Sequence, residues 1–266
     1  MFFILPLFQT IGYSFTDYNG INPKKEFTGL TNYFDVFQDK WFYNSMAFTG
    51  KSVLLMILLA NVLGFLLALA LNTKIRSRNI LRAIVFCPFV FNNVTVGFIW
   101  QFLLGRFMTD LYPLTGWKVF NIGWLSDNSL VLYSVVFVKL WQSIGYFMVI
   151  YLAGLQLLPQ DPLEAAVIDG CTGIKMIRYI TIPLMKPTAF VCIFLAITES
   201  LNMFPLIMSL TNGGPGHASE NISLYIYNEA FKSHRMGYAS ALAVILTIIM
   251  TIIAGLQMKL TREDAG

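Results

Sequence analysis

The sequence predicts an all-α membrane protein, and its composition and the length of its apolar runs are the observations behind that prediction. Of the 266 residues, 56% are hydrophobic and only 12% are charged, whereas a soluble domain carries about 25% charged residues. A helix needs about 20 apolar residues to cross the hydrocarbon core of a bilayer. We therefore expect residues 1–266 to form a single transmembrane domain of six helices, the first of them incomplete. The expected spans cover about 1–15, 50–71, 83–104, 130–158, 188–210 and 239–258.

The first apolar segment, residues 2–15, is too short to cross a membrane by itself. No basic residue precedes it, so it lacks the positively charged start of a signal peptide. We interpret it as the outer half of a first span. A polar loop over residues 16–45 is expected to follow it.

Two kinds of small-scale pattern predict how the spans pack. Ala60, Gly64 and Ala68 recur at every fourth residue of the second span, and a stripe of small residues lets another helix approach closely. Pro88 and Pro205 interrupt the third and fifth spans. Proline is tolerated in a membrane helix only where neighbouring groups or water satisfy the freed carbonyls.

The fourth span, residues 130–158, is longer than a bilayer requires. Part of it should therefore stand outside the membrane. Lys139 is then expected at the outer interface beside Trp141, where its long side chain can reach water. Lys51 is explained in the same way at the outer end of the second span.

The distribution of basic residues indicates the orientation, because cytoplasmic loops carry an excess of Lys and Arg. If the first half-span runs outward, the inner segments hold nine basic residues and the outer loops hold seven. Four of the nine crowd into residues 73–82, and the outer loops also carry eight acidic residues. This predicts that loops 73–82 and 159–187 and the C-terminus are cytoplasmic. The segment over residues 211–238, named the outer loop below, should face outward.

The loop between the fourth and fifth spans contains a distinctive pattern. Residues 164–170 read E-A-A-V-I-D-G and residues 180–183 read I-T-I-P. Glu164 offers an acceptor for a basic partner, and the two alanines after it allow another surface to approach. Gly170 can end a first helical piece, because glycine readily adopts a left-handed cap. Pro183 is expected to stop a second piece before the chain re-enters the membrane.

This pattern resembles the EAA signature of ABC-importer permeases, which is Glu-Ala-Ala, three residues, Gly, nine residues and Ile-x-Leu-Pro. Every position matches except that Ile182 stands where Leu is usual. In that family the loop forms a coupling helix that sits in a groove of the ATPase subunit. The resemblance implies a type I ABC-importer permease fold with a cytoplasmic coupling helix in loop 159–187. The coupling residues that it implies are Glu164, Ala165, Ala166, Asp169, Gly170, Ile180 and Pro183.

The outer loop strengthens the resemblance. It opens with Gly213, Gly214, Pro215 and Gly216, which predict a tight, non-helical turn at the membrane surface. The order L-T-x-G-G-P-G, Y-x-x-A-F and G-Y-A-S-A after the EAA pattern is similar to that of maltose-type carbohydrate-uptake permeases. The similarity extends over nearly the whole chain, from about residue 27 to about residue 256.

Polar residues inside the expected spans are candidates for the substrate pathway. Glu199 is the only carboxylate there, and Asn202 shares its helical face. A charge in the membrane is costly, so Glu199 either contacts a water-lined pathway or pairs with a neighbouring helix. Phe204 could stack on a sugar ring, or it could simply pack. The same two alternatives apply to Asn92 and Asn93 in the third span.

Several functions are excluded or disfavoured by the sequence. The chain has no G-x-x-x-x-G-K-[ST] motif, so it cannot hydrolyse ATP itself. Its three cysteines and two histidines show no metal-ligand or disulfide pattern. No nucleophile and base pair suggests a membrane-embedded hydrolase, and nothing points to a nucleic-acid partner. A secondary transporter using Glu199 is a rival, but we find no inverted repeat of the kind that such folds show.

The resemblance therefore implies a permease subunit of a binding-protein-dependent importer for a sugar or oligosaccharide, in a bacterial or archaeal cytoplasmic membrane. Its expected partners are membrane lipid, a second related permease, two ATP-binding subunits that hold ATP and Mg, and an extracytoplasmic solute-binding protein. Glycerol-phosphate uptake is the nearest alternative. We expect a neutral sugar instead, since the expected spans place no Arg or Lys at depth.

Overall fold

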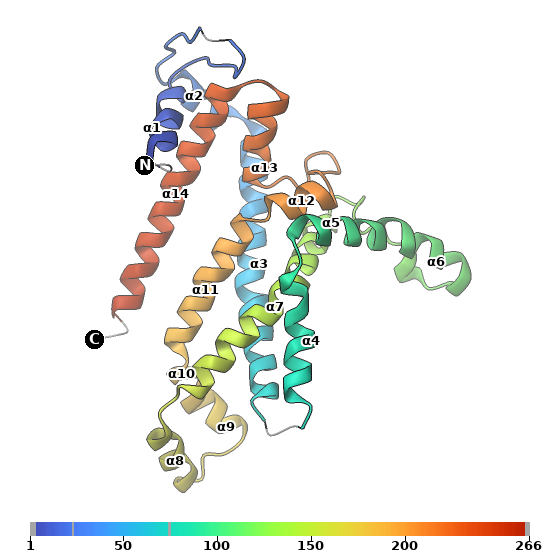
Figure 1. Cartoon of the computed structure of the whole chain (residues 1–266), viewed down its shortest axis with the longest axis vertical. Coiled ribbons are helices and arrows are strands. Elements are labelled where there is room, and N and C mark those ends of the chain that lie inside the picture. The colour runs from blue at the N-terminus through green and yellow to red at the C-terminus, as the bar shows by residue number, and fades with distance from the viewer. Residues whose placement is uncertain (1–3, 23, 74–75, 264–266) are drawn as a thin grey trace.

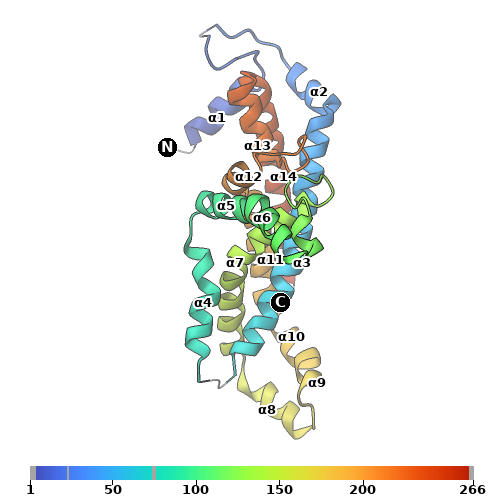
Figure 2. The same ribbon diagram turned by 90° about the vertical axis from the view of Figure 1, so that its right-hand side faces the viewer.

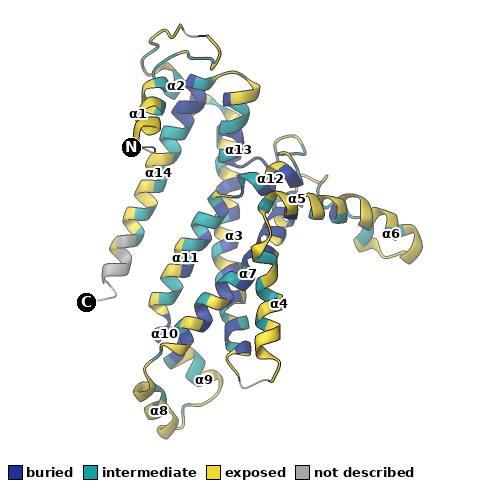
Figure 3. Cartoon of the chain, viewed as in Figure 1, coloured by how far each residue is buried: buried dark blue, intermediate teal, exposed yellow. Residues whose placement is uncertain are grey.

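Residues 4–22, 24–73 and 76–263 are described by the computed structural model, and each regular element in those ranges is a helix. The predicted all-α class is confirmed. Its centre is α7 (Val131–Gln156), which packs against three other long helices. These are α3 (Lys40–Leu71), α4 (Arg78–Val90) and α11 (Lys186–Leu201). Figure 1 shows the four helices running along the long axis of the molecule, and in Figure 3 the buried residues concentrate on α7, whereas α4 has none.

The contact between α3 and α7 depends on the predicted stripe of small residues. Ala60 and Ala68 are fully buried. A Cβ atom added at Gly64 would lie only 2.8 Å from the Cβ of Phe147 on α7. Because no side chain larger than hydrogen fits there, the two backbones approach closely. The packing role predicted for this stripe is confirmed.

Helix α3 begins earlier than the sequence predicts, at Lys40 instead of near residue 50. The Asp39 side chain caps it by accepting a hydrogen bond from the Trp41 N–H at 2.8 Å. Such a cap satisfies one of the free N–H groups at a helix start. The second half of the polar loop expected over residues 16–45 is therefore largely helical, since α2 (Thr31–Gln38) directly precedes α3. Lys51 lies within α3 and is exposed.

The third predicted span is not a straight helix. After α4 the chain bends by 93° into the segment Asn93–Thr115, which Figure 1 shows extending sideways from the bundle. That segment consists of α5 (Asn93–Gln101), a π-helical turn η1 (Phe102–Phe107) and α6 (Met108–Thr115). A short 3-10 turn, η2 (Lys118–Asn121), follows it. The predicted third span, residues 83–104, is thus divided into two helices, and the break lies a few residues after Pro88, the residue expected to interrupt this span.

Side-chain hydrogen bonds satisfy backbone groups at the break between α4 and α5. The Gln142 amide of α7 donates to the Phe91 carbonyl at 2.9 Å, and the Asn92 side chain accepts from the Val94 N–H at 2.8 Å. Backbone groups released by a break must be satisfied in this way inside a membrane protein.

The fifth predicted span is also divided. Helix α11 ends at Leu201 and the short α12 (Phe204–Leu210) starts after it, with Pro205 in its first turn. α12 packs against α5. The two interrupted spans therefore meet at their breaks.

Helices from both ends of the chain meet at one end of the bundle. α14 (Met236–Glu263) packs there against α1 (Ile4–Tyr13), α2 and α13 (Ile222–Tyr227), and a π-helical turn η4 (Asn228–Lys232) joins α13 to the following loop. The Asp39 carboxylate accepts hydrogen bonds from the hydroxyls of Tyr225 on α13 and Tyr238 on α14. Burial acts to raise the pKa of Asp39, but the bonds from these tyrosines and from the backbone N–H groups of Trp41 and Phe42 together outweigh it, and the pKa is lowered.

In the described residues, three helices are long and apolar enough to cross a membrane, namely α3, α7 and the Met236–Gln257 part of α14. There are up to five if each bent helix pair counts as one span. The predicted span over residues 130–158 agrees closely with α7. α1 is a helix of 10 residues, in keeping with the short first segment. The total of six spans stays a prediction.

Candidate functional site

The loop with the E-A-A pattern forms two helical pieces, as the sequence predicts. The first is α8 (Gln160–Ile168), and its end has the hydrogen bonds of a Schellman cap. The Gly170 N–H donates to the Val167 carbonyl at 3.0 Å, and the Cys171 N–H donates to the Ala166 carbonyl at 2.8 Å. Gly170 has a φ of +74°, and nothing lies within 4 Å of where its Cβ would be. Glycine is needed here for the left-handed backbone and not for space.

The outward surface of α8 is exposed and partly apolar. Glu164 and Ala165 are exposed, and within the described chain the Glu164 carboxylate has no hydrogen-bond or ion-pair partner. The exposed fraction is 85% for Ile168 and 83% for Ile174, just beyond the turn. Ala166, by contrast, is buried within the chain itself. Only the first of the two alanines is thus open to another surface, so the expectation for Ala166 was wrong.

The second piece runs from α9 (Ile174–Met176) through a π-helical turn η3 (Ile177–Thr181) into α10 (Ile182–Leu184). Ile180 in it is half-buried. Pro183 lies inside this piece and does not end it; the chain bends by 70° after Leu184, before α11. The second piece therefore ends one residue after Pro183, close to the expected stop.

The two helical pieces occupy one end of the molecule. In Figures 1 and 2, α8 and α9 form the lower tip, next to the turn between α3 and α4, while α2 and α13 lie at the opposite end. The E-A-A loop and residues 76–82 of the basic loop thus share one end of the bundle, while residues 74–75 lie outside the described residues. The outer loop occupies the other end, as expected for two sides of a membrane.

The expected position of Lys139 was wrong. Its side chain is only 3% exposed, and its Nζ lies 2.6 Å from a carboxylate oxygen of Glu199, whose side chain is 27% exposed. α7 therefore carries a buried cation that is paired with α11. Of the two alternatives for Glu199, the structure shows the pairing with a neighbouring helix. A lysine does lie deep in the helix packing, contrary to the sequence-based expectation.

Three of the five candidate pathway residues come together at the helix breaks. Asn93, Asn202 and Phe204 line a cavity of about 530 Å³ between α5, the α11–α12 break and α13. We name it the aromatic cavity, because Tyr227 and Phe231 also line it. Glu199 and Asn92 are not among its lining residues. Asn92 instead caps α5, a role that the sequence did not predict.

The glycine-rich start of the outer loop forms the expected tight turn. Gly213 and Gly216 have φ values of +84° and +50°, and the Gly214–Pro215 peptide is cis. The Ser219 hydroxyl donates to the Gly214 carbonyl at 2.5 Å and contacts the Thr211 hydroxyl at 2.8 Å. The turn is therefore held by its own polar groups.

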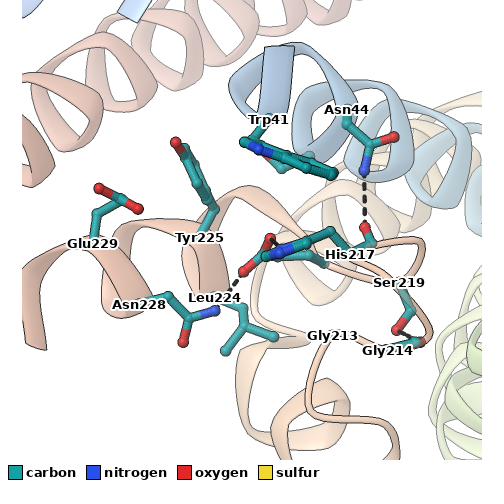
Figure 4. A network of polar contacts seen from close by, with 12 residues as sticks. Trp41, Asn44, Gly213, Gly214, His217, Ser219, Leu224, Tyr225, Asn228 and Glu229 are labelled. Carbon is teal, nitrogen blue, oxygen red and sulfur yellow. Dashed lines mark hydrogen bonds and ion pairs between the residues drawn. The ribbon is translucent and has the colours of Figure 1, made fainter. Parts of the chain in front are cut away.

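Sequence reasoning missed a buried polar network beside this turn. Glu220 is 1% exposed, binds His217 Nδ1 at 2.5 Å, and accepts a hydrogen bond from the Asn228 amide. Figure 4 shows the two α3 side chains that contact the His217 segment. The Asn44 amide donates to the His217 carbonyl at 2.8 Å, and the Trp41 ring lies 4.4 Å from the His217 ring, tilted by 39°. The residues of this network come from distant segments of the chain. Only Glu220, an acidic residue shortly after the glycine turn, could have signalled it in the sequence.

No three His, Cys, Asp or Glu side chains in the described ranges gather closely enough to hold a metal ion. The arrangement instead offers a docking tip at one end, a buried ion pair and an aromatic cavity in the middle, and an ordered loop at the other end.

Comparison with known proteins decides the family. The family described as "Binding-protein-dependent transport system inner membrane component" matches residues 60–262. The chain belongs to this family. It is therefore an inner-membrane permease component of a binding-protein-dependent importer, and its relatives are transporter subunits.

Two curated relatives match over nearly the whole chain. The "Probable starch degradation products transport system permease protein AmyD" of Thermoanaerobacterium thermosulfurigenes is 36% identical over 98% of this chain and 88% of its own. The multiple sugar-binding transport system permease protein MsmF of Streptococcus mutans is 34% identical over 99% of this chain and 91% of its own.

A solved structure has the same fold. A bacterial ABC transporter involved in the import of the acidic polysaccharide alginate matches with a TM-score of 0.82, covering 98% of this chain and 91% of that chain. The two chains are 21% identical, so this likeness concerns the fold. It confirms the ABC-importer permease architecture that the sequence predicts.

Proposed function

We propose that this chain is one of two permease subunits in an ATP-driven importer that carries a sugar or oligosaccharide across the cytoplasmic membrane. The observation that carries the proposal is the tip formed by α8 and α9. It presents the Glu164 carboxylate, which has no partner among the described residues, beside exposed apolar residues, Ile168 and Ile174. An apolar anchor flanked by a charge is a typical protein-docking surface.

The occupant of that surface in the proposal is a cytoplasmic ATP-binding subunit. Two such subunits would hold ATP and Mg, and the chain itself would do no hydrolysis. Closure of the ATPases would move the tip, and the 70° bend before α11 would pass the movement to the helix that carries Glu199. ATP and the solute-binding protein would each shift an equilibrium between inward and outward openings by their differential affinity for the two states.

The substrate assignment rests on relatives and on the cavity. AmyD and MsmF are named for starch degradation products and for multiple sugars. A second solved alginate transporter is described in complex with a pentasaccharide-bound periplasmic protein. An aromatic cavity with amide groups suits a neutral sugar, and we assign Asn93, Asn202 and Phe204 to the pathway, with Glu199 and Asn92 positioned close to it along the chain.

A glycerol-phosphate substrate is the second candidate, and two observations favour it. The sn-glycerol-3-phosphate transport system permease protein UgpA of Brucella abortus is 30% identical over 99% of this chain. Lys139 also supplies a buried cation. The cation is already neutralised by Glu199 at 2.6 Å, so it offers no net positive charge to a phosphate. Because the charge of Lys139 is already paired, a neutral sugar remains the favoured substrate.

The test compares energy sources in cells that make the full importer. We expect uptake of radiolabelled maltotriose to survive an uncoupler and to disappear when the ATP-binding subunits are inactivated. Uptake of sn-glycerol 3-phosphate by the same cells distinguishes the second candidate. Uptake that persists without the ATPases and collapses with the uncoupler would contradict the proposal and favour a secondary transporter.

A further inference from the structure

The aromatic cavity has a wall of three rings that come from two separate segments. The centroid of Phe204 lies 5.3 Å from that of Tyr227, which lies 5.1 Å from that of Phe231. Phe204 starts α12, whereas Tyr227 ends α13 and Phe231 lies one turn later in η4. Phe231 is 58% exposed. The rings therefore form a continuous wall whose outer part is open.

Of the four polar residues that line the cavity, Ser223 donates a hydrogen bond to the Leu201 carbonyl at 3.4 Å, and the other three lack side-chain partners among the described residues. The side-chain amides of Asn93 and Asn202 and the hydroxyl of Tyr227 make no hydrogen bond to any described residue. Asn92, one residue from Asn93, is by contrast used as a helix cap. An amide can donate two hydrogen bonds and accept two. The cavity thus holds polar groups that are available to a ligand.

The size and chemistry of the cavity restrict what fits. Its volume of about 530 Å³ lies within the range of about 300–1,000 Å³ that is usual for small-molecule sites. A pyranose ring has an apolar C–H face and a rim of hydroxyls. The C–H face of the sugar can stack on the wall of aromatic rings, and its hydroxyls can form hydrogen bonds with the amides of Asn93 and Asn202.

We propose that the aromatic cavity binds one pyranose ring of the transported sugar, with Tyr227 as the stacking platform and Asn93 and Asn202 as hydroxyl partners. This inference rests on the proposed import of a sugar. It assigns residues of the outer loop, Tyr227 and Phe231, to substrate contact. Because the cavity lies at both helix breaks, the bound ring touches α5 and the α11–α12 connection together.

The test measures binding of radiolabelled maltotriose to the purified membrane complex of the two permeases and the ATP-binding subunits, without the solute-binding protein. Isomaltotriose and raffinose serve as second and third probes. Tyr227→Leu removes the ring and should weaken binding about two- to tenfold. Tyr227→Phe keeps the ring and should bind within about twofold of the wild type. Asn202→Leu should weaken binding, since the hydroxyls lose a partner.

Phe98→Leu serves as the matched control, because Phe98 is a 58% exposed aromatic on α5 that does not line the cavity. It should leave binding unchanged. Basal ATP hydrolysis, measured on each variant, shows that the complex is intact. A fluorescence shift of Tyr227→Trp on adding maltotriose gives an independent readout of a sugar at that position.

Three results would overturn the inference. One is unchanged binding in intact complexes of both Tyr227→Leu and Asn202→Leu. Another is a loss in Phe98→Leu equal to that in Tyr227→Leu, which would point to a general packing effect or to coverage by the second permease. The third is a wild-type importer that takes up sugar but binds none of the three probes. Failure of the proposed function is distinct, since the wild-type importer would then take up no sugar with ATP.

Discussion

Removing either member of the Lys139–Glu199 pair should destabilise the chain, and the two removals should differ in size. The Lys139 side chain is 3% exposed and that of Glu199 is 27% exposed. Glu199→Leu leaves a buried ammonium group with no counter-charge. Lys139→Met leaves a carboxylate that still reaches solvent. The first change should therefore cost more free energy of unfolding than the second.

General magnitudes set the scale of both effects. Breaking a buried ion pair by removing one partner costs about 3–5 kcal/mol, because the other charge is left uncompensated. We expect Glu199→Leu to fall in that range, and Lys139→Met to cost about 1–3 kcal/mol, as for a group left without a hydrogen-bond partner. Replacing both partners together is often neutral. The variant Lys139→Met with Glu199→Leu should therefore be more stable than Glu199→Leu alone.

A double-mutant cycle provides the measurement. The free energy of unfolding of the wild type, the two single variants and the double variant is determined by SDS titration in mixed detergent micelles. The expected coupling energy is at least about 1 kcal/mol, outside the range of additive sites. Additive single effects, or a double variant less stable than either single variant, would refute the buried pairing.

The remaining predictions concern the coupling tip, the acid range and the topology. Gly170→Val should cost about 1–2 kcal/mol locally, because valine disfavours the left-handed backbone at this position. It should abolish transport while the chain remains in the membrane, and Gly170→Asn should have a milder effect. Normal uptake by the valine variant would contradict the coupling role. The pKa of Asp39 is lowered from its usual value of 3.8. Its hydrogen bonds therefore stabilise the fold fully above pH 3.8, and this stabilisation is lost as the pH falls through the lower pKa of the folded state. Asp39→Asn should remove this acid dependence from the unfolding curves. Cysteines placed at Gly216 and Arg78 in a cysteine-free chain should react with an impermeant thiol reagent in intact cells at Gly216 only, and the reverse pattern would overturn the topology.

The sequence predicted the features that depend on local pattern. Long apolar runs located α3, α7 and α14, and the small-residue stripe located the close approach at Gly64. Gly170 was recognised as a left-handed cap because that conformation depends on one residue type. The breaks near Pro88 and Pro205 were also signalled. The size of the 93° bend was not, since it depends on support from Gln142, far away in the chain.

The sequence could not predict pairings between distant segments. Lys139 was placed at a membrane surface because the fourth span is longer than a bilayer requires, while its actual partner, Glu199, lies on another helix. Asp39 looked like a loop residue until the structure brought Tyr225 and Tyr238 to its carboxylate. The early start of α3 follows from the same residue, which acts as both cap and acceptor. These contacts arise from tertiary packing, which periodicity does not encode.

The most direct test of the account is transport by the reconstituted importer. The chain, the second permease and the ATP-binding subunits are placed in liposomes with ATP and Mg on the side of α8, and the solute-binding protein with radiolabelled maltotriose on the side of the outer loop. We predict maltotriose uptake that requires ATP hydrolysis and the binding protein, and that is lost with Gly170→Val while the complex stays assembled. Uptake that is equal without ATP, or full coupled uptake by the Gly170→Val importer, would contradict the claim that this chain couples ATP hydrolysis to sugar import through its α8 tip.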